Sequence, residues 1–412
     1  MSMTLAEKIL ARASGRSRVA PDEIVVADVD LAMSHENADL VRKAFLEIGV
    51  PRVWDPEKIV IIFDHRIPAE SEKTAATHKA VREFVRQQGI RHFYDVGRGG
   101  ICHQVLAENG HVRPGMVVVG TDSHTTTHGA FGAFATGIGA TEMAGVWVEG
   151  RLWFKVPSTL RIEVDGEFAP WVSAKDLILW IIGRLGAAGA DYRAVEFDGS
   201  AVRRMSVASR MVLCNLSMEM GAKAAFTPVV EIGPDPEAAY ERVLHVNLDC
   251  DIREPQIACP HSVDNVRPLS ALGEVPVDQA VLGSCTNGRL EDLEVAARIL
   301  AGRRVHPKTR LIIIPASQRI YLEAIQLGYV QTFVEAGAII NPPGCGPCVG
   351  VHQGILAAGE VCVSSTNRNF IGRMGSKDSF VYLASPAVVA ASAVAGRIVH
   401  PEAVVAKENA HV

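Results

Sequence analysis

The sequence has no apolar run long enough to cross a bilayer, which takes about 20 residues. Its longest apolar runs lie at 59–63, 311–315 and 386–396, and each of them is shorter than that. We therefore expect no membrane segment. Residues 1–8 include an acidic side chain and do not lead into the apolar stretch of a secretory signal peptide, so we expect the protein to stay in the cytoplasm.

An excess of positive charge is also missing. Lys and Arg number 41 and Asp and Glu number 46, which gives a formal net charge of −5. Nucleic acids bind to basic surfaces, so we expect no nucleic-acid partner. The composition excludes a disordered chain, because 48% of the 412 residues are apolar and only 21% are charged. A chain of this length is expected to form two or three domains.

Cysteine is scattered rather than concentrated. The eight cysteines do not form the dense framework of a small disulfide-bonded secreted domain. The closest pair lies in the motif Cys345-Gly-Pro-Cys348, after which we predict a helix at 349–357. Because free cysteine is among the most often buried residue types, we interpret the five cysteines outside the candidate sites as packing residues. They are Cys102, Cys214, Cys250, Cys259 and Cys362.

Three kinds of site are compatible with the Cys345/Cys348 pair. A thioredoxin-like redox pair has the same spacing, but that fold is much shorter than this chain. A structural zinc site takes four ligands, and the sequence has no second close cysteine pair. In an iron-sulfur cluster, Cys285 at the end of another predicted strand would be the third thiolate ligand. Three ligands would leave one iron open, and an open metal site can act as a Lewis acid on a substrate.

Short apolar runs alternate with helical patterns along the chain, which is typical of α/β proteins with parallel sheets covered on both faces. We predict strands at 58–63, 116–119, 279–282, 311–314 and 338–340. We predict helices at 74–88, 290–300 and 318–327. Breaks near 155 and 270 divide the chain into three predicted α/β domains, 1–155, 156–270 and 271–412.

Acidic and imidazole side chains follow two of these strands. The pair Asp64-His65 comes after the first, the segment Asp122-Ser123-His124 comes after the second, and His103 lies between them. Ligands of parallel sheets bind beyond the carboxyl ends of the strands, and carboxylate–imidazole pairs can orient a proton donor or acceptor. Each segment alone could be an ordinary turn with a surface histidine. Their recurrence favours a catalytic site, although the further motifs of a binuclear metallohydrolase are absent.

Two arginines, Arg368 and Arg373, lie in the glycine-punctuated segment 364–375. The guanidinium group matches the geometry of a carboxylate, so this pair suits a substrate with two or three carboxylates. A solvated loop with ordinary ion pairs is the alternative.

Four motifs occur in the same order as in a known family. They are Asp122-Ser-His124, Ser284-Cys-Thr-Asn287, Gly344-Cys-Gly-Pro-Cys348 and Asn367-Arg-Asn-Phe370. With them the sequence resembles the aconitase superfamily over nearly its whole length. Further segments at 125–131, 372–375 and 382–386 resemble the branch formed by the large subunits of 3-isopropylmalate dehydratase and homoaconitase. The resemblance implies three associated α/β domains around a central iron-sulfur cluster, without the family's swivel domain.

The resemblance also implies the residues of the site. It implies one 4Fe-4S cluster held by Cys285, Cys345 and Cys348, with one iron that has no protein ligand and Asn367 beside the cluster. The implied catalytic residues are Asp64, His65, His103, Asp122, His124 and Glu219. The implied substrate-binding residues are His35, Ser123, Asn215, Arg368 and Arg373. The segment that contains His35 and Glu36 matches the family least well.

The resemblance finally implies a hydro-lyase that removes and re-adds water on a small hydroxy di- or tricarboxylate. We expect the isomerisation of 2-isopropylmalate and 3-isopropylmalate through isopropylmaleate in leucine biosynthesis. Homoaconitase and the dimethylmalate or methylmalate hydro-lyases are the alternatives, beside an RNA-binding protein or a thiol-disulfide oxidoreductase from other classes. The swivel domain of the full-length enzymes supplies a catalytic serine, and its motif is absent here. We therefore expect a separate small subunit in a heterodimer or heterotetramer.

Overall fold

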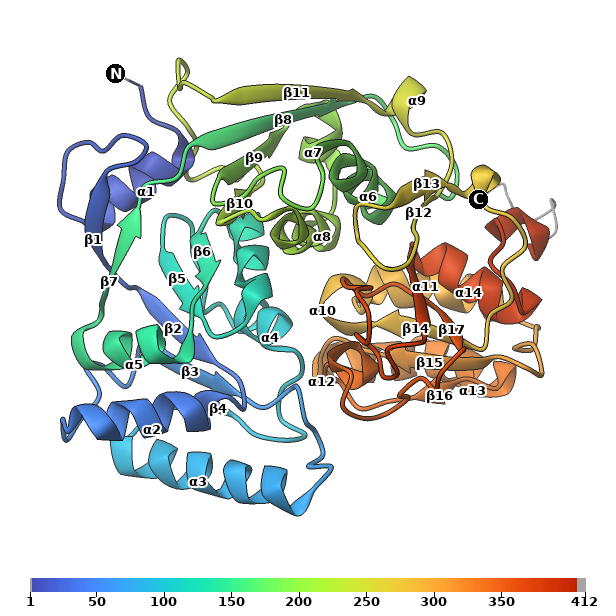
Figure 1. Ribbon diagram of the computed structural model, residues 1–412, viewed down its shortest axis with the longest axis horizontal. Coiled ribbons are helices and arrows are strands. Elements are labelled where there is room, and N and C mark those ends of the chain that lie inside the picture. The colour runs from blue at the N-terminus through green and yellow to red at the C-terminus, as the bar shows by residue number, and fades with distance from the viewer. Residues whose placement is uncertain (1, 406–412) are drawn as a thin grey trace. The chain divides into compact units, whose positions relative to one another are not determined.

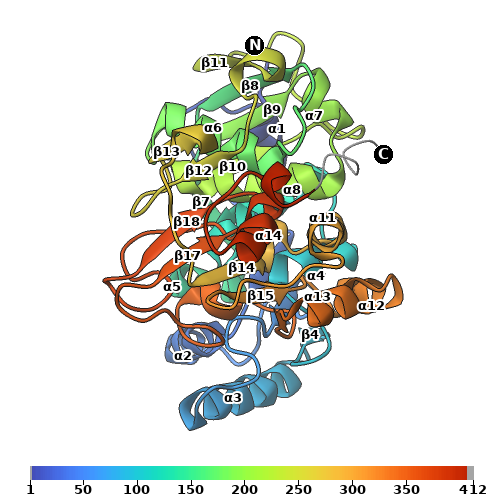
Figure 2. The same ribbon diagram turned by 90° about the vertical axis from the view of Figure 1, so that its right-hand side faces the viewer.

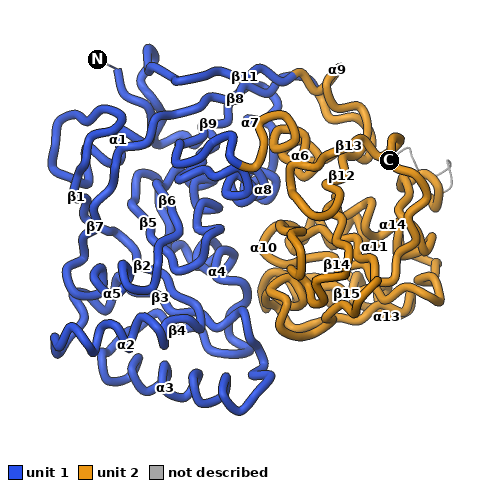
Figure 3. Tube along the Cα trace, in the orientation of Figure 1, with its two compact units in different colours: residues 1–166, 188–246 blue, residues 167–187, 247–412 orange. Residues whose placement is uncertain are grey.

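The computed structural model describes residues 2–405 and is shown in two views in Figures 1 and 2. Residue 1 and residues 406–412, which belong to the predicted first and third domains, lie outside the described residues. The chain divides into two compact units (Figure 3), unit 1 with residues 1–166 and 188–246 and unit 2 with residues 167–187 and 247–412. The domain breaks near 155 and 270 stay a prediction. Among the described helices, none has the length and hydropathy of a bilayer-spanning segment.

A five-stranded sheet forms the centre of unit 1. Its strand order is β4-β3-β2-β5-β6, and every neighbouring pair is parallel. The strands are β2 (Leu31–Ser34), β3 (Ile59–Ile62), β4 (His92–Tyr94), β5 (Val117–Gly120) and β6 (Phe134–Gly137). Alternate residues of a strand point to opposite faces, so the continuous apolar runs predict burial of both faces. Both faces of β3 are buried, because Ile59 and Ile61 join one apolar cluster and Val60 and Ile62 another.

Helices cover the two faces of this sheet. One cluster contains residues of α2 (Ala38–Ile48), α3 (Glu72–Gln88) and α5 (Ala140–Glu149), and the other contains residues of α4 (Cys102–Glu108). Figures 1 and 2 show α2 and α3 side by side. Phe84 of α3 stacks on Trp147 of α5 with ring centroids 5.5 Å apart, and Phe45 of α2 contacts both rings edge to face. These aromatic contacts hold the three helices α2, α3 and α5 together.

The rest of unit 1 contains an antiparallel pair and a four-stranded sheet. The pair is β1 (Ile24–Asp28) with β7 (Arg151–Lys155), and the sheet has the order β10-β9-β8-β11. Its strands are β8 (Thr159–Asp165), β9 (Ala194–Asp198), β10 (Ala224–Phe226) and β11 (Arg242–Asn247). The helices are α1 (Leu5–Ala13), α7 (Ser200–Arg204), α8 (Val207–Leu216) and the 3-10 helices η1 (Ser123–Phe131) and η2 (Ser217–Met220).

Unit 2 is built on a seven-stranded sheet of order β13-β12-β18-β17-β14-β15-β16. Strands β18 to β16 in this order run parallel, whereas β12 is antiparallel to β13 and β18. The strands are β12 (Gln256–Ala258), β13 (Val266–Pro268), β14 (Gln279–Gly283), β15 (Arg310–Ile314), β16 (Ile339–Ile340), β17 (Val361–Ser364) and β18 (Phe380–Leu383).

One apolar cluster joins this sheet to four helices, α11 (Leu290–Leu300), α12 (Gln318–Gln326), α13 (Tyr329–Ala336) and α14 (Pro386–Ala395). The other helices described in unit 2 are α6 (Ala174–Leu185), α9 (Leu248–Asp251), α10 (Ser284–Asn287), η3 (Leu269–Ala271), η4 (Gly346–Val349) and η5 (Pro401–Ala403). The α/β class, all five predicted strands and all three helices between them are confirmed, with ends that shift by one or two residues.

The helix predicted at 349–357 is wrong. After the short η4, the backbone bends and forms a single bridge between Leu356 and Gly375. Gly350, Gln353 and Gly354 have positive φ angles of 73°, 60° and 125°, which a right-handed helix does not allow. A Cβ atom at Gly354 would lie 2.3 Å from Ile312 Cδ1, so the glycine lets the loop pass directly against the sheet.

Candidate active site

Four neighbouring strands of unit 1 end at one edge of the sheet, and each is followed by a sequence-predicted site residue. His35 follows β2, Asp64 and His65 follow β3, His103 lies at the start of α4 after β4, and Asp122 follows β5. Because β4, β3, β2 and β5 are adjacent and parallel, their carboxyl ends bring these side chains together. We call His35, Asp64, His65, His103, Asp122 and His124 the imidazole cluster.

The carboxylate of Asp122 lies at the centre of the imidazole cluster. Its Oδ1 lies 2.8 Å from His103 Nε2 and accepts a hydrogen bond of 2.8 Å from the backbone N–H of His124. Its Oδ2 lies 3.3 Å from His65 Nε2. Burial alone would raise the pKa of Asp122, but the hydrogen bonds with His103, His124 and His65 hold it well below its ordinary value. The ionised carboxylate can therefore hold proton-bearing imidazoles on either side.

A second carboxylate orients His65 from its other ring nitrogen. Asp64 Oδ1 lies 2.6 Å from His65 Nδ1, and Asp64 Oδ2 accepts a hydrogen bond of 2.8 Å from the backbone of Cys102. Asp64 is fully buried and His65 is only partly buried. The imidazole of His65 thus joins two carboxylates, Asp64 and Asp122, which is an arrangement suited to holding and moving a proton.

Glu36 fixes the backbone beneath His65. Its carboxylate accepts hydrogen bonds of 3.0 Å from the backbone N–H groups of both His65 and Arg66. Its Oε2 lies 3.6 Å from His35 Nδ1, and the ring of His35 stacks on that of His65 with centroids 3.9 Å apart. Burial would raise the pKa of Glu36, but the hydrogen bond with His35 and the charge of His65 lower it to about 2.

Four of these side chains lie close enough together to hold a metal ion. His35, Glu36, Asp64 and His65 each bring one ligand atom within 4.8 Å of the others. Both carboxylates already accept backbone hydrogen bonds, and Asp64 pairs with His65. We therefore interpret the group as a hydrogen-bonded proton-handling arrangement.

Two sequence-predicted residues come from the α8–η2 segment. Glu219 Oε1 lies 2.6 Å from His124 Nε2, which gives this histidine a carboxylate partner of its own. Asn215 is fully buried, and its side-chain amide donates a hydrogen bond of 2.9 Å to Thr127 Oγ1 in η1. The structure thus joins Glu219 to the imidazole cluster through His124.

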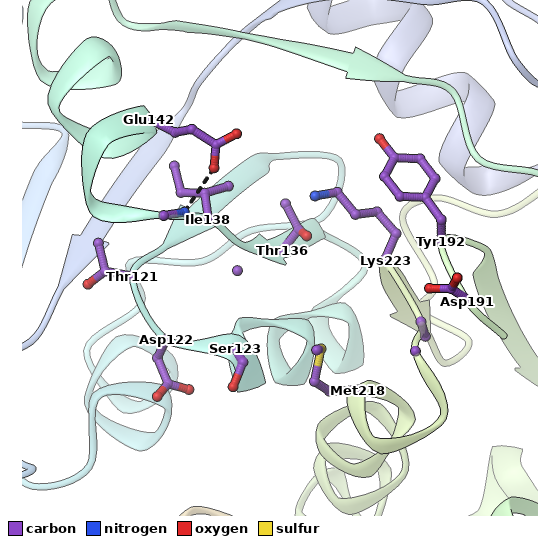
Figure 4. Close-up of a pocket in the computed structure, with 14 residues that line it drawn as sticks. Thr121, Asp122, Ser123, Thr136, Ile138, Glu142, Asp191, Tyr192, Met218 and Lys223 are labelled. Atoms are coloured by element: carbon purple, nitrogen blue, oxygen red, sulfur yellow. Dashed lines mark hydrogen bonds between the residues drawn. The ribbon is translucent and has the colours of Figure 1, made fainter. Parts of the chain in front are cut away.

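Ser123 borders a pocket of about 520 Å³ in unit 1. Figure 4 shows Glu142, Tyr192, Met218 and Lys223 on its other walls. The Lys223 ammonium lies 5.4 Å from the Tyr192 ring centroid, and burial lowers the pKa of this lysine while Glu142 opposes the shift. The volume falls in the range of small-molecule sites, and charges of both signs line the pocket.

In unit 2, the candidate cluster cysteines also follow parallel strands. Cys285 lies in α10 directly after β14, and Cys345 and Cys348 lie in the loop and η4 after β16. The preceding Ser284 has a φ of 66°, an uncommon conformation for a residue with a side chain. The three cysteines are buried, with exposures of 7%, 8% and 2%, and none forms a disulfide.

Asn367, in the loop after β17, joins two of these cysteines. Its side-chain amide donates a hydrogen bond of 3.1 Å to Cys285 Sγ, and Cys348 Sγ lies 3.5 Å from its carbonyl oxygen. The Arg373 guanidinium lies 3.7 Å from Cys348 Sγ. The backbone N–H of Cys348 donates a hydrogen bond of 3.3 Å to the Cys345 carbonyl. One asparagine and one arginine thus contact the sulfur atoms directly. Arg368, which follows Asn367, is partly buried.

Buried cations surround the cysteines. Lys175 and Arg289 have exposures of 0% and 4%. Arg289 donates hydrogen bonds of 2.9 Å and 2.7 Å to the carbonyls of Cys285 and Thr286. Burial lowers the pKa of Arg289, whereas Asp292 and Cys285 oppose the shift. Positive charge of this kind stabilises thiolates, the form in which cysteine binds metal.

The donor set fits an iron-sulfur cluster. The three thiols are buried, Asn367 links the sulfur atoms of Cys285 and Cys348, Arg373 contacts that of Cys348, and buried basic groups can offset the charge that thiolates and a cluster bring. Such donors and charges accompany cluster ligands in general. The other two interpretations left open for the Cys345/Cys348 pair do not explain why Asn367 links Cys285 to Cys348.

Four of the five cysteines interpreted as packing residues are buried, namely Cys102, Cys214, Cys259 and Cys362. The interpretation is wrong for Cys250, which is exposed. Cys250 lies in the four-residue helix α9, two residues after the buried Leu248, and only the latter side chain points inward. Composition gives no indication of which side of so short a helix is covered.

Sequence reasoning missed Lys175, Arg289 and Asp292, the charged residues buried beside the cysteines. The segment Ser173-Ala-Lys-Asp176 is an ordinary helix start, in which Asp176 accepts hydrogen bonds from the backbone and hydroxyl of Ser173. Nothing in that local pattern distinguishes a buried lysine from an exposed one. Burial lowers the pKa of Lys175 to about 7, although Cys285 and Asp176 oppose the shift.

Comparison with known proteins identifies the family. The sequence profile of the aconitase family (aconitate hydratase) matches residues 5–232 and 267–396. The chain is 53% identical to the protein named 3-isopropylmalate dehydratase large subunit 1 of Methanopyrus kandleri, over 97% of this chain and 99% of that protein. It is 49% identical to the probable methanogen homoaconitase large subunit of Methanothermobacter thermautotrophicus, over 98% of both chains.

A solved structure extends the comparison to the fold. The holo form of Thermococcus kodakaraensis aconitase X matches with a TM-score of 0.52, covers 84% of each chain and shares 13% sequence identity. At this identity, the match concerns the fold alone.

Proposed function

The chain belongs to the aconitase family, and we propose that it acts as the large subunit of a 3-isopropylmalate dehydratase. The observation that carries this proposal is the similarity to proteins of that name over practically the full length of both chains. The reaction is that of a hydro-lyase. It isomerises 2-isopropylmalate and 3-isopropylmalate by removing and re-adding water, with isopropylmaleate as the intermediate.

The proposed cofactor is one 4Fe-4S cluster held by Cys285, Cys345 and Cys348. Support comes from the burial of the three thiols and from the donors that Asn367 and Arg373 direct at the sulfur atoms of Cys285 and Cys348. When bound, the cluster supplies an iron without a protein ligand, which acts as a Lewis acid toward the substrate.

The imidazole cluster handles the proton that accompanies the hydroxyl group. His65 is oriented by Asp64 at one ring nitrogen and by Asp122 at the other, and His103 shares Asp122 with it. In this proposal, one imidazolium protonates the departing hydroxyl and becomes a neutral imidazole, and the ionised Asp122 stabilises the imidazolium before the transfer. His124 with Glu219 forms a second imidazole–carboxylate pair of the same kind.

Other side chains bind the substrate. Arg368 and Arg373 would bind its carboxylates, because a guanidinium group pairs with both oxygens at once. Ser123, Asn215 and His35 would contact its polar groups, and the pocket beside Ser123 supports this role for the serine. Positive charge near the substrate carboxylates also stabilises the negative charge that develops when the adjacent C–H bond breaks.

A small subunit completes the proposed enzyme. The relatives are named large subunits, which implies a separate small one. We propose that it carries the swivel domain with the catalytic serine and forms a heterodimer or heterotetramer with this chain. We further propose that the chain folds into three α/β domains, with breaks near 155 and 270, and works in the cytoplasm, where its free cysteines stay reduced.

Homoaconitase is the second candidate, because probable homoaconitase large subunits are 49% and 52% identical to the chain. The test is an anaerobic hydration assay on isopropylmaleate and homoaconitate, with the iron-reconstituted chain alone and with the small subunit from the same organism. We expect isopropylmaleate to react fastest and only with both subunits present. Preference for homoaconitate would favour the second candidate, and activity of the chain alone would contradict the two-subunit proposal.

A further inference from the structure

Lys175 in α6 is a fully buried lysine that forms no salt bridge with a described residue. Its relative exposure is 0%, and in the described part of the chain no carboxylate oxygen lies within the 4.0 Å of a salt bridge. A buried ammonium group without a counter-charge is costly, because it loses its hydration and gains little in return. The ammonium group is therefore held by hydrogen bonds and by charges that lie beyond salt-bridge distance.

The two hydrogen-bond acceptors of Lys175 lead directly to the cysteines. Its Nζ donates to the backbone carbonyl of Ser365 at 2.8 Å and also to that of Thr366. The next residue is Asn367, whose side chain contacts Cys285 Sγ and Cys348 Sγ. Lys175 therefore holds the loop that presents Asn367 to the sulfur atoms.

Four acidic groups act on Lys175 at longer range, namely Cys285, Cys348, Asp176 and Asp292. The two carboxylates are engaged elsewhere. Asp176 accepts hydrogen bonds from Ser173 and the Gln256 backbone, and Asp292 accepts them from Asn287 and the Arg289 backbone. A carboxylate that accepts neutral hydrogen bonds keeps its charge, so Asp176 and Asp292 balance the ammonium together with the sulfur atoms of Cys285 and Cys348.

We infer that Lys175 is a positioning residue for the iron-sulfur cluster. It balances the charge of the cluster, and it holds the loop that brings Asn367 to the sulfur atoms. The inference rests on the proposed cluster of this chain. A 4Fe-4S core with three thiolate ligands carries net negative charge, so a nearby buried cation favours its retention and its reduced state. Removal of the cation should lower the reduction potential and weaken the binding of iron.

The test compares three variants of the full chain, reconstituted anaerobically with iron and sulfide and checked for folding by circular dichroism. Lys175→Met removes the charge and both hydrogen bonds, Lys175→Gln keeps a donor without the charge, and Lys175→Arg keeps both. The matched control is Lys308→Met, since Lys308 is an exposed lysine of unit 2. The readouts are bound iron and sulfide, the midpoint potential of the cluster, and the rate of iron loss in air.

We expect the Met and Gln variants to shift the potential to more negative values and to bind iron about 10- to 100-fold more weakly. The Arg variant should retain most of the wild-type values, and Lys308→Met should match the wild type. Wild-type potential and iron retention in a folded Met or Gln variant would overturn the inference. Failure of both neutral variants to fold would overturn it too, because Lys175 would then serve the fold rather than the cluster. A wild-type chain that takes up no cluster would instead contradict the proposed function.

Discussion

The side-chain amide of Asn367 donates a hydrogen bond of 3.1 Å to Cys285 Sγ. The same side chain lies 3.5 Å from Cys348 Sγ, so it joins the cysteine after β14 to one after β16. A hydrogen bond to a sulfur ligand stabilises its negative charge and raises the reduction potential of a bound cluster.

Asn367→Ala should therefore leave a cluster that forms but loses iron faster. We expect a more negative midpoint potential and about 10-fold faster iron loss in air, measured after anaerobic reconstitution. Asn369→Ala is the control, because Asn369 bonds to the carbonyl of Cys259 instead of to a sulfur atom. Equal potentials and equal iron retention in wild type and Asn367→Ala would contradict this role of the hydrogen bond.

Cys345→Ser should abolish the cluster, because it removes one of three proposed thiolate ligands. The expected result is a folded chain with little bound iron and sulfide and no hydration activity with the small subunit. Cys250→Ser is the control, since Cys250 is exposed. Full iron and activity in Cys345→Ser would show that the ligand assignment is wrong.

Glu36→Gln should lower kcat without releasing the cluster. Glu36 holds the backbone N–H groups of His65 and Arg66, and its negative charge faces His35. A small displacement of a proton-transfer group costs about 100-fold in rate. We expect a loss of about 10- to 100-fold in kcat, a small change in KM and a shifted pH profile.

The control for Glu36→Gln is Glu47→Gln on the exposed side of α2. An unchanged pH profile together with normal kcat would exclude the positioning role of Glu36.

Asp122→Asn should lower the free energy of unfolding at neutral pH, and this effect should disappear in acid. The folded state holds the pKa of Asp122 well below its ordinary value, because His103, His124 and His65 bond to it. A lowered pKa contributes stability above the ordinary Asp value of about 4, and this contribution disappears as the pH falls through the lowered value. We expect Asp122→Asn to cost about 1–3 kcal/mol of unfolding free energy at pH 7.

Urea unfolding of wild type and Asp122→Asn at several pH values between 7 and the acid limit of folding measures this difference. The difference in unfolding free energy between the two proteins should become smaller below about pH 4. A constant difference in unfolding free energy at all of these pH values would mean that the lost stability comes from packing and not from the ionised carboxylate.

Much of the fold and of the candidate site could be predicted from the sequence. The strands β3, β5, β14, β15 and β16 are short apolar runs, and apolar periodicity marked helices α3, α11 and α12. Since adjacent parallel strands direct their carboxyl-terminal loops to one sheet edge, the positions of Asp64, His65 and Asp122 already indicated a shared site. The arrangement of polar contacts could not be predicted. That Asp122 lies between His65 and His103 depends on how three separate loops meet.

Local sequence was enough to establish the α/β class, the main helices and strands, and the cysteine and arginine motifs. These depend on the periodicity and spacing of residues within short segments of the chain. Three features depend instead on the folded chain: Lys175 is buried, Cys250 is exposed, and the segment after Cys348 lies as a loop against the sheet instead of forming a helix. Burial and partners are set by the distant segments that pack around a side chain. At Gly354, the side chain of Ile312 in β15 leaves no room for a Cβ atom. This contact is between residues far apart in the sequence, so no local pattern contains it.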